Sequence, residues 1–171
     1  SFYQIIRKSV PREFHGNFYN IANGLIADLL ILCAFIDQPE HVKRHIKEYV
    51  YKNFYYTIDY KNADEYTETL FEFQRSLEDY ITDIITMESP DYCCFSIFKG
   101  NLGPSISVLN HIKRQYPAIK TIIGGAVFSN DLSIGTKNFE NFVHYTPADK
   151  IIIGEGELLF NKVLDEMDSD K

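Results

Sequence analysis

Tryptophan is absent from this 171-residue chain, and cysteine and methionine are scarce, with three and two residues. An odd number of cysteines cannot form a closed set of disulfides, and it fits a reducing compartment, so we expect a cytoplasmic protein. Long apolar runs are also missing. The longest, Leu25 to Ile36, contains Asp28 and is much shorter than the stretch of about 20 residues that spans a bilayer. The first ten residues lack the apolar core and cleavage site of a signal peptide, so we expect no membrane partner.

Basic residues are outnumbered, because 17 lysines and arginines face 24 acidic residues, for a net charge of −7. Binding to a phosphate backbone needs a basic face, so a nucleic-acid partner is not expected. The acidic excess is concentrated in residues 61–90, which hold only Lys61 and Arg75 as basic residues. A solvated helix face explains this bias better than an acidic docking surface. The apolar fraction of 45% and the length are typical of one globular domain.

The second half of the chain predicts a parallel sheet. Short apolar runs at 91–98, 120–123 and 150–153 read as buried strands, each bounded by glycine or proline. Helical spacing predicts a helix over 103–116 and another from about Leu158. The polar stretch between the last two strands reads mostly as a loop, with room for a short helix near 138–143. Strands that alternate with helices are typical of a parallel sheet covered by helices on both faces.

The first half extends this pattern less clearly. Residues 64–88 show one apolar face of a long helix, and a second helix is expected over 41–53. Alternating apolar residues over 54–60 predict another strand. Residues 29–35 fit either a helix or a strand, and residues 2–6 fit an edge strand. We therefore expect an α/β fold with a mostly parallel five-stranded sheet, Rossmann-like or flavodoxin-like, with helices on both faces.

Glycines cluster where the three later strands end. In sheets of this kind, ligands bind outside the carboxyl ends of the strands. Glycines there either let a large flat or anionic ligand approach the backbone, or simply turn tight corners, and the residues alone leave both readings open. The glycines concerned are Gly100, Gly103, Gly124, Gly125, Gly154 and Gly156.

Three sequence elements carry a resemblance to a known family. They are Ser96-Ile-Phe-Lys-Gly-Asn-Leu102, Ile122-Ile-Gly-Gly125 and Ile151-Ile-Ile-Gly-Glu-Gly-Glu157. In this order they resemble the cobalamin (vitamin B12)-binding domain of B12-dependent radical SAM enzymes. The resemblance implies a cobalamin-binding core over residues 54–171, preceded by a loosely matched N-terminal part of the domain, residues 1–53.

The resemblance also implies which residues contact cobalamin. Ser96 would contact the nucleotide tail through its hydroxyl, and a loop beside the corrin ring would be formed by Phe98, Lys99, Gly100, Asn101 and Leu102. Gly124 and Gly125, followed by Ala126, would line the channel for the tail, and the sheet end near the corrin edge would be closed by Gly154, Glu155 and Gly156. A bulky residue at position 125 is then expected to block binding without changing the fold.

Two motifs of the wider family are missing. Asp-x-His-x-x-Gly, whose histidine ligates cobalt, does not occur, so we expect cobalamin to bind without a protein histidine ligand and expect no metal site. Cys-x-x-x-Cys-x-x-Cys, which holds a 4Fe–4S cluster, cannot be formed by Cys33, Cys93 and Cys94. The resemblance therefore implies that the cluster and S-adenosylmethionine belong to a radical SAM domain of the same polypeptide, C-terminal to this chain. That parent enzyme would carry out methyl transfer or rearrangement, and this chain alone would not be catalytic.

Two other functions remain open. One is a degenerate, cofactor-free module that organises the parent enzyme or recognises a peptide. The other is a flavodoxin-like nucleotide or flavin binder, although no Gly-x-Gly-x-x-Gly opens a helix. Among single residues, Cys93 and Cys94 are expected to pack in the core with side chains on opposite faces of their strand. His41 and His45, one helical turn apart, suit a solvated helix face better than a metal site.

Overall fold

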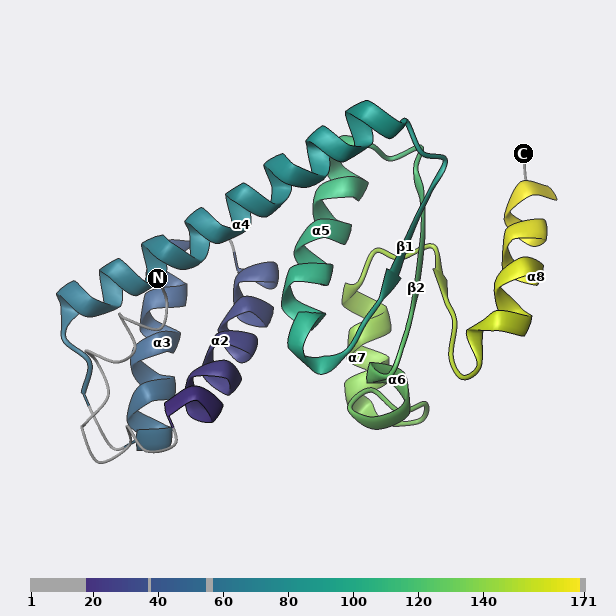
Figure 1. Cartoon of the computed structure of the whole chain (residues 1–171). Coiled ribbons are helices and arrows are strands. Elements are labelled where there is room, and N and C mark those ends of the chain that lie inside the picture. Colours follow the sequence, from purple (N-terminus) through teal and green to yellow (C-terminus); the bar gives the residue numbers. More distant parts are fainter. Residues whose placement is uncertain (1–17, 37, 55–56, 170–171) are drawn as a thin grey trace.

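The computed structural model describes residues 18–36, 38–54 and 57–169. Three parallel strands form one small sheet in the order β1-β2-β3, and helices make up most of the rest (Figure 1). The strands are β1 (Tyr92–Ser96), β2 (Lys120–Gly124) and β3 (Lys150–Ile151). The helices are α2 (Phe18–Phe35), α3 (Pro39–Phe54), α4 (Tyr60–Glu88), the 3-10 helix η2 (Lys99–Asn101), α5 (Leu102–Gln115), α6 (Val127–Asn130), α7 (Lys137–Tyr145) and α8 (Gly156–Ser169).

The predicted five-stranded sheet is wrong, because the described residues form three strands. Of the strand expected over 54–60, the described residues form no part: Phe54 ends α3, residues 57–59 belong to no strand and Tyr60 begins α4. Asp59 explains this, since its carboxylate accepts a hydrogen bond from the Asn62 N–H at 2.7 Å and so caps the helix. Residues 29–35 are helical, and β3 is shorter than expected. The edge strand expected over 2–6 lies outside the described residues.

The N-terminal helices α2, α3 and α4 enclose a core of their own. Leu29 and Cys33 of α2 pack with Val42 and Ile46 of α3 and with the fully buried Leu70 of α4. The C-terminal half of α4 then joins a second cluster, in which Ile85 packs with residues of α5. A single 29-residue helix thus contributes to two separate cores.

A glycine allows α2 and α5 to pack closely. A Cβ atom built on Gly103 would lie 2.5 Å from the backbone nitrogen of Ile31 and 2.8 Å from Cβ of Leu30. Asn110 secures the same contact further along, because its side-chain amide donates to the Ala34 carbonyl at 3.0 Å. Gly103 therefore serves helix packing, a role that differs from both readings of the glycines at the strand ends.

The two faces of the sheet pack against different helices. Phe95 and Ile123 point towards α5, α6 and α7, where Ile106, Leu109 and Phe128 complete the core. The opposite face carries Ile122 and Ile152, which meet Phe160, Val163, Leu164 and Met167 of α8. In Figure 1, α5 and α8 accordingly lie on opposite sides of β1 and β2.

Asp149 fastens β3 to the rest of the sheet. Its carboxylate accepts hydrogen bonds from the backbone N–H of Thr121 at 2.6 Å and from the Thr121 hydroxyl at 2.9 Å, and it forms an ion pair with Lys113 of α5. Burial works against ionisation of this carboxyl, but the hydrogen bonds from Lys113 and Thr121 outweigh it, so the pKa of Asp149 lies below its usual value.

None of the helices in the described ranges is long and apolar enough to cross a membrane.

Candidate functional site: a pocket at the carboxyl end of the sheet

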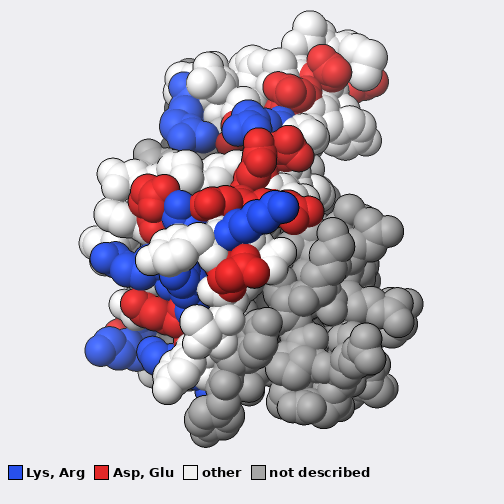
Figure 2. Space-filling view, turned by 90° about the vertical axis from the view of Figure 1, so that its left-hand side faces the viewer, with Lys and Arg blue, Asp and Glu red and all other residues white. Residues whose placement is uncertain are grey.

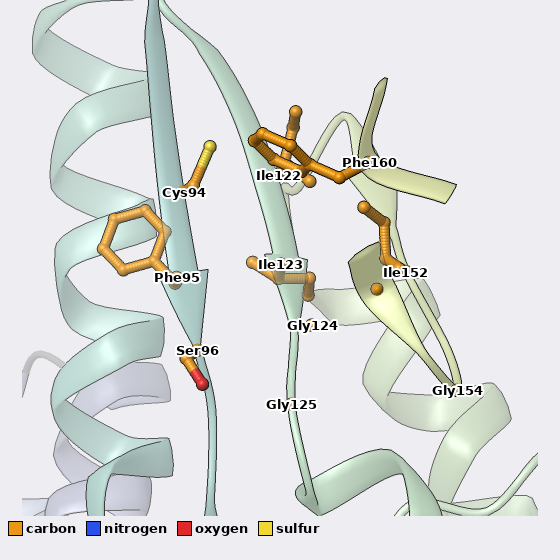
Figure 3. A pocket seen from close by; sticks show the side chains of 11 residues that line it. Cys94, Phe95, Ser96, Ile122, Ile123, Gly124, Gly125, Ile152, Gly154 and Phe160 are labelled. Carbon is orange, nitrogen blue, oxygen red and sulfur yellow. The ribbon is translucent and has the colours of Figure 1, made fainter. Parts of the chain in front are cut away.

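A pocket of about 710 Å³ opens between α8 and the sheet, near the carboxyl ends of the strands (Figure 3). Its volume lies within the range of about 300–1,000 Å³ that is usual for small-molecule sites. Five of its lining residues are among those expected to contact cobalamin: Ser96, Gly124, Gly125, Gly154 and Gly156. They follow or end three different strands, so the parallel sheet brings together residues that lie up to 60 positions apart in the chain.

Strand periodicity and register build the floor of this pocket. Cys94 and Ser96 share one face of β1 because alternate residues of a strand point to the same side. The register pairs Cys94 with Ile122 and Ser96 with Gly124, so these four residues form two adjacent rows across β1 and β2. Gly124 has no side chain, and a Cβ added there would lie 3.2 Å from the Ile152 carbonyl oxygen, so this glycine allows the segment after β3 to approach β2 closely.

The walls of the pocket are mostly apolar. Ile122 and Ile152 rise from the sheet, and Phe160 of α8 lies over them (Figure 3). Among the lining residues that the structure describes, the polar side-chain groups are the Ser96 hydroxyl and the Cys94 thiol. Burial raises the pKa of the Cys94 thiol, which favours its neutral form. The lining can therefore receive a flat uncharged group and offers one hydroxyl to orient it.

Gly125 is required by a close backbone approach. Its φ is +116°, and an added Cβ would lie 2.5 Å from the Ile97 carbonyl oxygen and 2.6 Å from the Ile97 nitrogen. The neighbouring hydrogen bond from the Ile97 N–H to the Gly124 carbonyl, 2.7 Å long, holds the two segments together. A bulky residue at position 125 would therefore disturb the fold, contrary to the expectation from the sequence.

The loop after β1 is held by one side chain. The Asn101 side-chain oxygen accepts from the Phe98 N–H at 2.8 Å, and its amide donates to the Ser96 carbonyl at 3.0 Å. Phe98, with 56% of its surface exposed, Lys99 and Gly100 are left open to solvent at the carboxyl end of β1. These residues adjoin the strand end that carries Ser96, but they do not line the pocket.

The other expected contact residues have varied positions. Leu102 is half-buried against the core beneath the sheet. Ala126 and Glu155 are exposed and lie outside the pocket lining, whereas Gly154 and Gly156, on either side of Glu155, are part of it. Gly154 has a φ of +92°, and a Cβ added there would meet no atom within 4 Å.

Sequence reasoning missed part of the pocket. It assigned Cys94 to the core, but the side chain is exposed and lines the pocket, while Cys93 is half-buried against the α4–α5 side. It also missed Ile122, Ile152 and Phe160. The alternation of a strand could have found the first two, since each stands two positions before a glycine that was singled out.

No metal centre was found in the described part of the chain, where no three His, Cys, Asp or Glu side chains meet in a suitable group. His41 is exposed, and His45 lies beside Glu48, with 4.0 Å between Nδ1 and Oε2. His111 is buried against α4, where its Nε2 is 2.9 Å from the Thr82 hydroxyl.

Two lysines of α3 lie against the first turns of α4, where the acidic segment begins. Lys43 of α3 forms ion pairs with Glu40 and with Asp64 of α4, and the Lys47 ammonium lies 3.4 Å from the centre of the Tyr60 ring. Figure 2 shows basic and acidic side chains interspersed over the described part of one face. This mixture is typical of a solvated surface.

Comparisons of the chain with models of protein families, with curated proteins and with solved structures gave no match.

Proposed function

We propose that this chain binds a cobalamin and that the pocket between the sheet and α8 receives the benzimidazole end of its nucleotide tail. One observation carries the proposal. Five residues singled out in the sequence as cobalamin contacts, from three separate strand ends, line a single pocket. Glycines that only turn corners after parallel strands would meet at the same edge, so the support comes from the open space of about 710 Å³ that these residues line together with α8.

The chemistry of the pocket supports this ligand. Benzimidazole is flat and largely apolar, so its faces would lose water against Ile122, Ile152 and Phe160, which favours binding by about 25 cal/mol per Å² of apolar surface. The Ser96 hydroxyl lines the same pocket, where it would bond a polar atom of the tail. The phosphate of a nucleotide or of a flavin would find no basic side chain among the described lining residues.

Residues outside the pocket would meet the rest of the cofactor. The corrin ring is too large for the pocket and would lie at its mouth, where Phe98, Lys99 and Gly100 are exposed. Bound cobalamin would supply a methyl carrier or redox partner. The residues of this chain would bind and orient it for a radical SAM domain of the same polypeptide, which would hold the 4Fe–4S cluster and S-adenosylmethionine. Such an enzyme would be cytoplasmic, and this chain would have no catalytic residue.

Titration with hydroxocobalamin, followed by ultraviolet–visible absorbance and by co-elution in gel filtration, tests the proposal. The informative variant is Ser96→Leu, which fills the pocket from an exposed strand position where a larger side chain is tolerated. Ser129→Leu, at an exposed position of α6, is the matched control. We expect the wild type and the control to bind alike and Ser96→Leu to lose tenfold or more in affinity, corresponding to about 1.4 kcal/mol.

Two results would contradict the proposal. If the wild type binds no cobalamin, the cofactor-free module becomes the better reading. If Ser96→Leu binds as tightly as Ser129→Leu, cobalamin is held somewhere other than this pocket. A parallel titration with flavin mononucleotide tests the flavin alternative, for which we expect no binding.

A further inference from the structure

The connection between β3 and α8 has few restraints. The last backbone hydrogen bond of the sheet in this region runs from the Ile152 N–H to the Ile123 carbonyl, at 2.8 Å. The described backbone hydrogen bonds outside helices and strands include none from Ile153, Gly154 or Glu155. Gly154 lies in the left-handed region with open space around it. Ile153 packs against the core beneath the sheet, whereas Gly154 and Glu155 are exposed, so these two residues have the properties of a hinge.

α8 itself is held mainly through one apolar face. Phe160, Val163, Leu164 and Met167 pack on Ile122 and Ile152, and Met167 is 5% exposed. The ion pair between Lys150 and Glu166 is 3.5 Å long and largely exposed, so it adds little. In Figure 1, α8 stands apart from the other helices, with the sheet as its neighbour.

The weakly attached α8 covers one side of the pocket. The pocket lies between the sheet and α8, and Phe160 forms part of its wall. The preceding residue, Leu159, is not among the lining residues and is 41% exposed. A ligand lying against Ile122 and Ile152 would be covered by Phe160 when α8 is in place. It could enter only past this helix or through the open end of the strands.

We propose that α8 is a hinged lid, which swings on Gly154 and Glu155 and closes Phe160 over a ligand bound to the sheet. The hinge requires no ligand, but the identity of the ligand rests on the proposed cobalamin function. The proposed lid has two testable consequences. α8 must open more readily than the other helices in the free protein, and a ligand must slow its opening.

Hydrogen exchange measured by mass spectrometry tests the first consequence. We expect the amides of residues 156–169 to exchange together and at least tenfold faster than those of α5, while β1 and β2 stay protected. Gly154→Ala should speed exchange in α8 by fivefold or more, since a side chain at a φ of +92° favours leaving the closed conformation. Gly135→Ala is the matched control, because Gly135 has a φ of +83°, equally open surroundings and no place in the pocket. Exchange in α8 as slow as in α5, or an equal response to both substitutions, would overturn the lid.

Binding kinetics with hydroxocobalamin test the second consequence. Phe160→Ala should raise the dissociation rate about tenfold with little change in the association rate, whereas Leu159→Ala, on the same helix, should change neither by more than about twofold. Hydroxocobalamin should also slow exchange in α8 of the wild type. Binding without any effect on α8 would overturn the lid and leave the cobalamin function standing. Fast exchange in α8 with no cobalamin binding would overturn the function and leave the lid standing.

Discussion

Replacing Gly125 by alanine tests how tightly the backbone is packed behind the pocket. The added methyl group would come within 2.6 Å of both the nitrogen and the carbonyl oxygen of Ile97. Carbon atoms do not approach backbone atoms so closely, so β2 and the segment after β1 must separate. The hydrogen bond from the Ile97 N–H to the Gly124 carbonyl would be strained at the same time.

The expected loss of stability follows from two contributions. Placing a side chain at a φ of +116° costs about 1–3 kcal/mol, and forcing an extra methyl group into a filled space costs about as much again. Together they predict a loss of about 2–6 kcal/mol. Because the total stability of a domain is about 5–15 kcal/mol, the variant should lose a large part of its stability.

Urea unfolding followed by far-ultraviolet circular dichroism measures this loss. Gly135→Ala is the control, since it has a similar left-handed φ but no atom within 4 Å of the added Cβ, and it should lose only about 1–2 kcal/mol. Equal losses for the two variants would refute the argument from close packing. An unchanged midpoint for Gly125→Ala would show that the backbone segments are not in contact as described.

Three further predictions concern stability, thiol reactivity and cobalt. Asp149→Asn should cost about 1–3 kcal/mol at neutral pH. Because folding lowers the pKa of Asp149, its contribution is present above the unfolded value of about 3.9 and is lost as the pH falls through the folded pKa. The difference in the free energy of unfolding between Asp149→Asn and the wild type should therefore shrink in acid. Asp83→Asn, at an exposed position, should unfold with the same free energy as the wild type. Cys94 should react with N-ethylmaleimide and be protected by cobalamin, whereas the buried Cys33, whose pKa burial raises to about 11, should not react; equal labelling of both would contradict the structure. Electron paramagnetic resonance of bound cobalt(II) cobalamin should show no nitrogen splitting, because no described lining residue is a histidine, and a splitting lost in a histidine→alanine variant would refute this.

The sequence was most informative where short apolar runs end at glycine or proline. Such boundaries located β1, β2 and α5 to within a few residues. The alternation over 54–60 misled because it spans a helix start, where Asp59 acts as the N-cap and Ile58 is buried before it. Local capping competed with strand alternation there, and only tertiary packing of Ile58 shows which of them prevails.

The site was predictable where glycine marks it and hidden where ordinary side chains form it. Gly124 and Gly154 stood out in the sequence because they follow apolar runs. Phe160 could not be found, because its place over Ile122 depends on how α8 returns across the sheet. Contacts between segments far apart in the chain are set by packing, and periodicity within one segment carries no information about them.

The length of α4 has a consequence for how the chain unfolds. At about 1.5 Å per residue, its 29 residues extend for about 44 Å, with Leu70 in the core of the N-terminal helices and Ile85 in the core beside α5. Because α4 packs in both cores, unfolding of one core removes part of the packing that holds α4 in the other. The two cores should therefore melt in one cooperative transition, and a fragment that begins after α3 would leave half of α4 with an apolar side facing water.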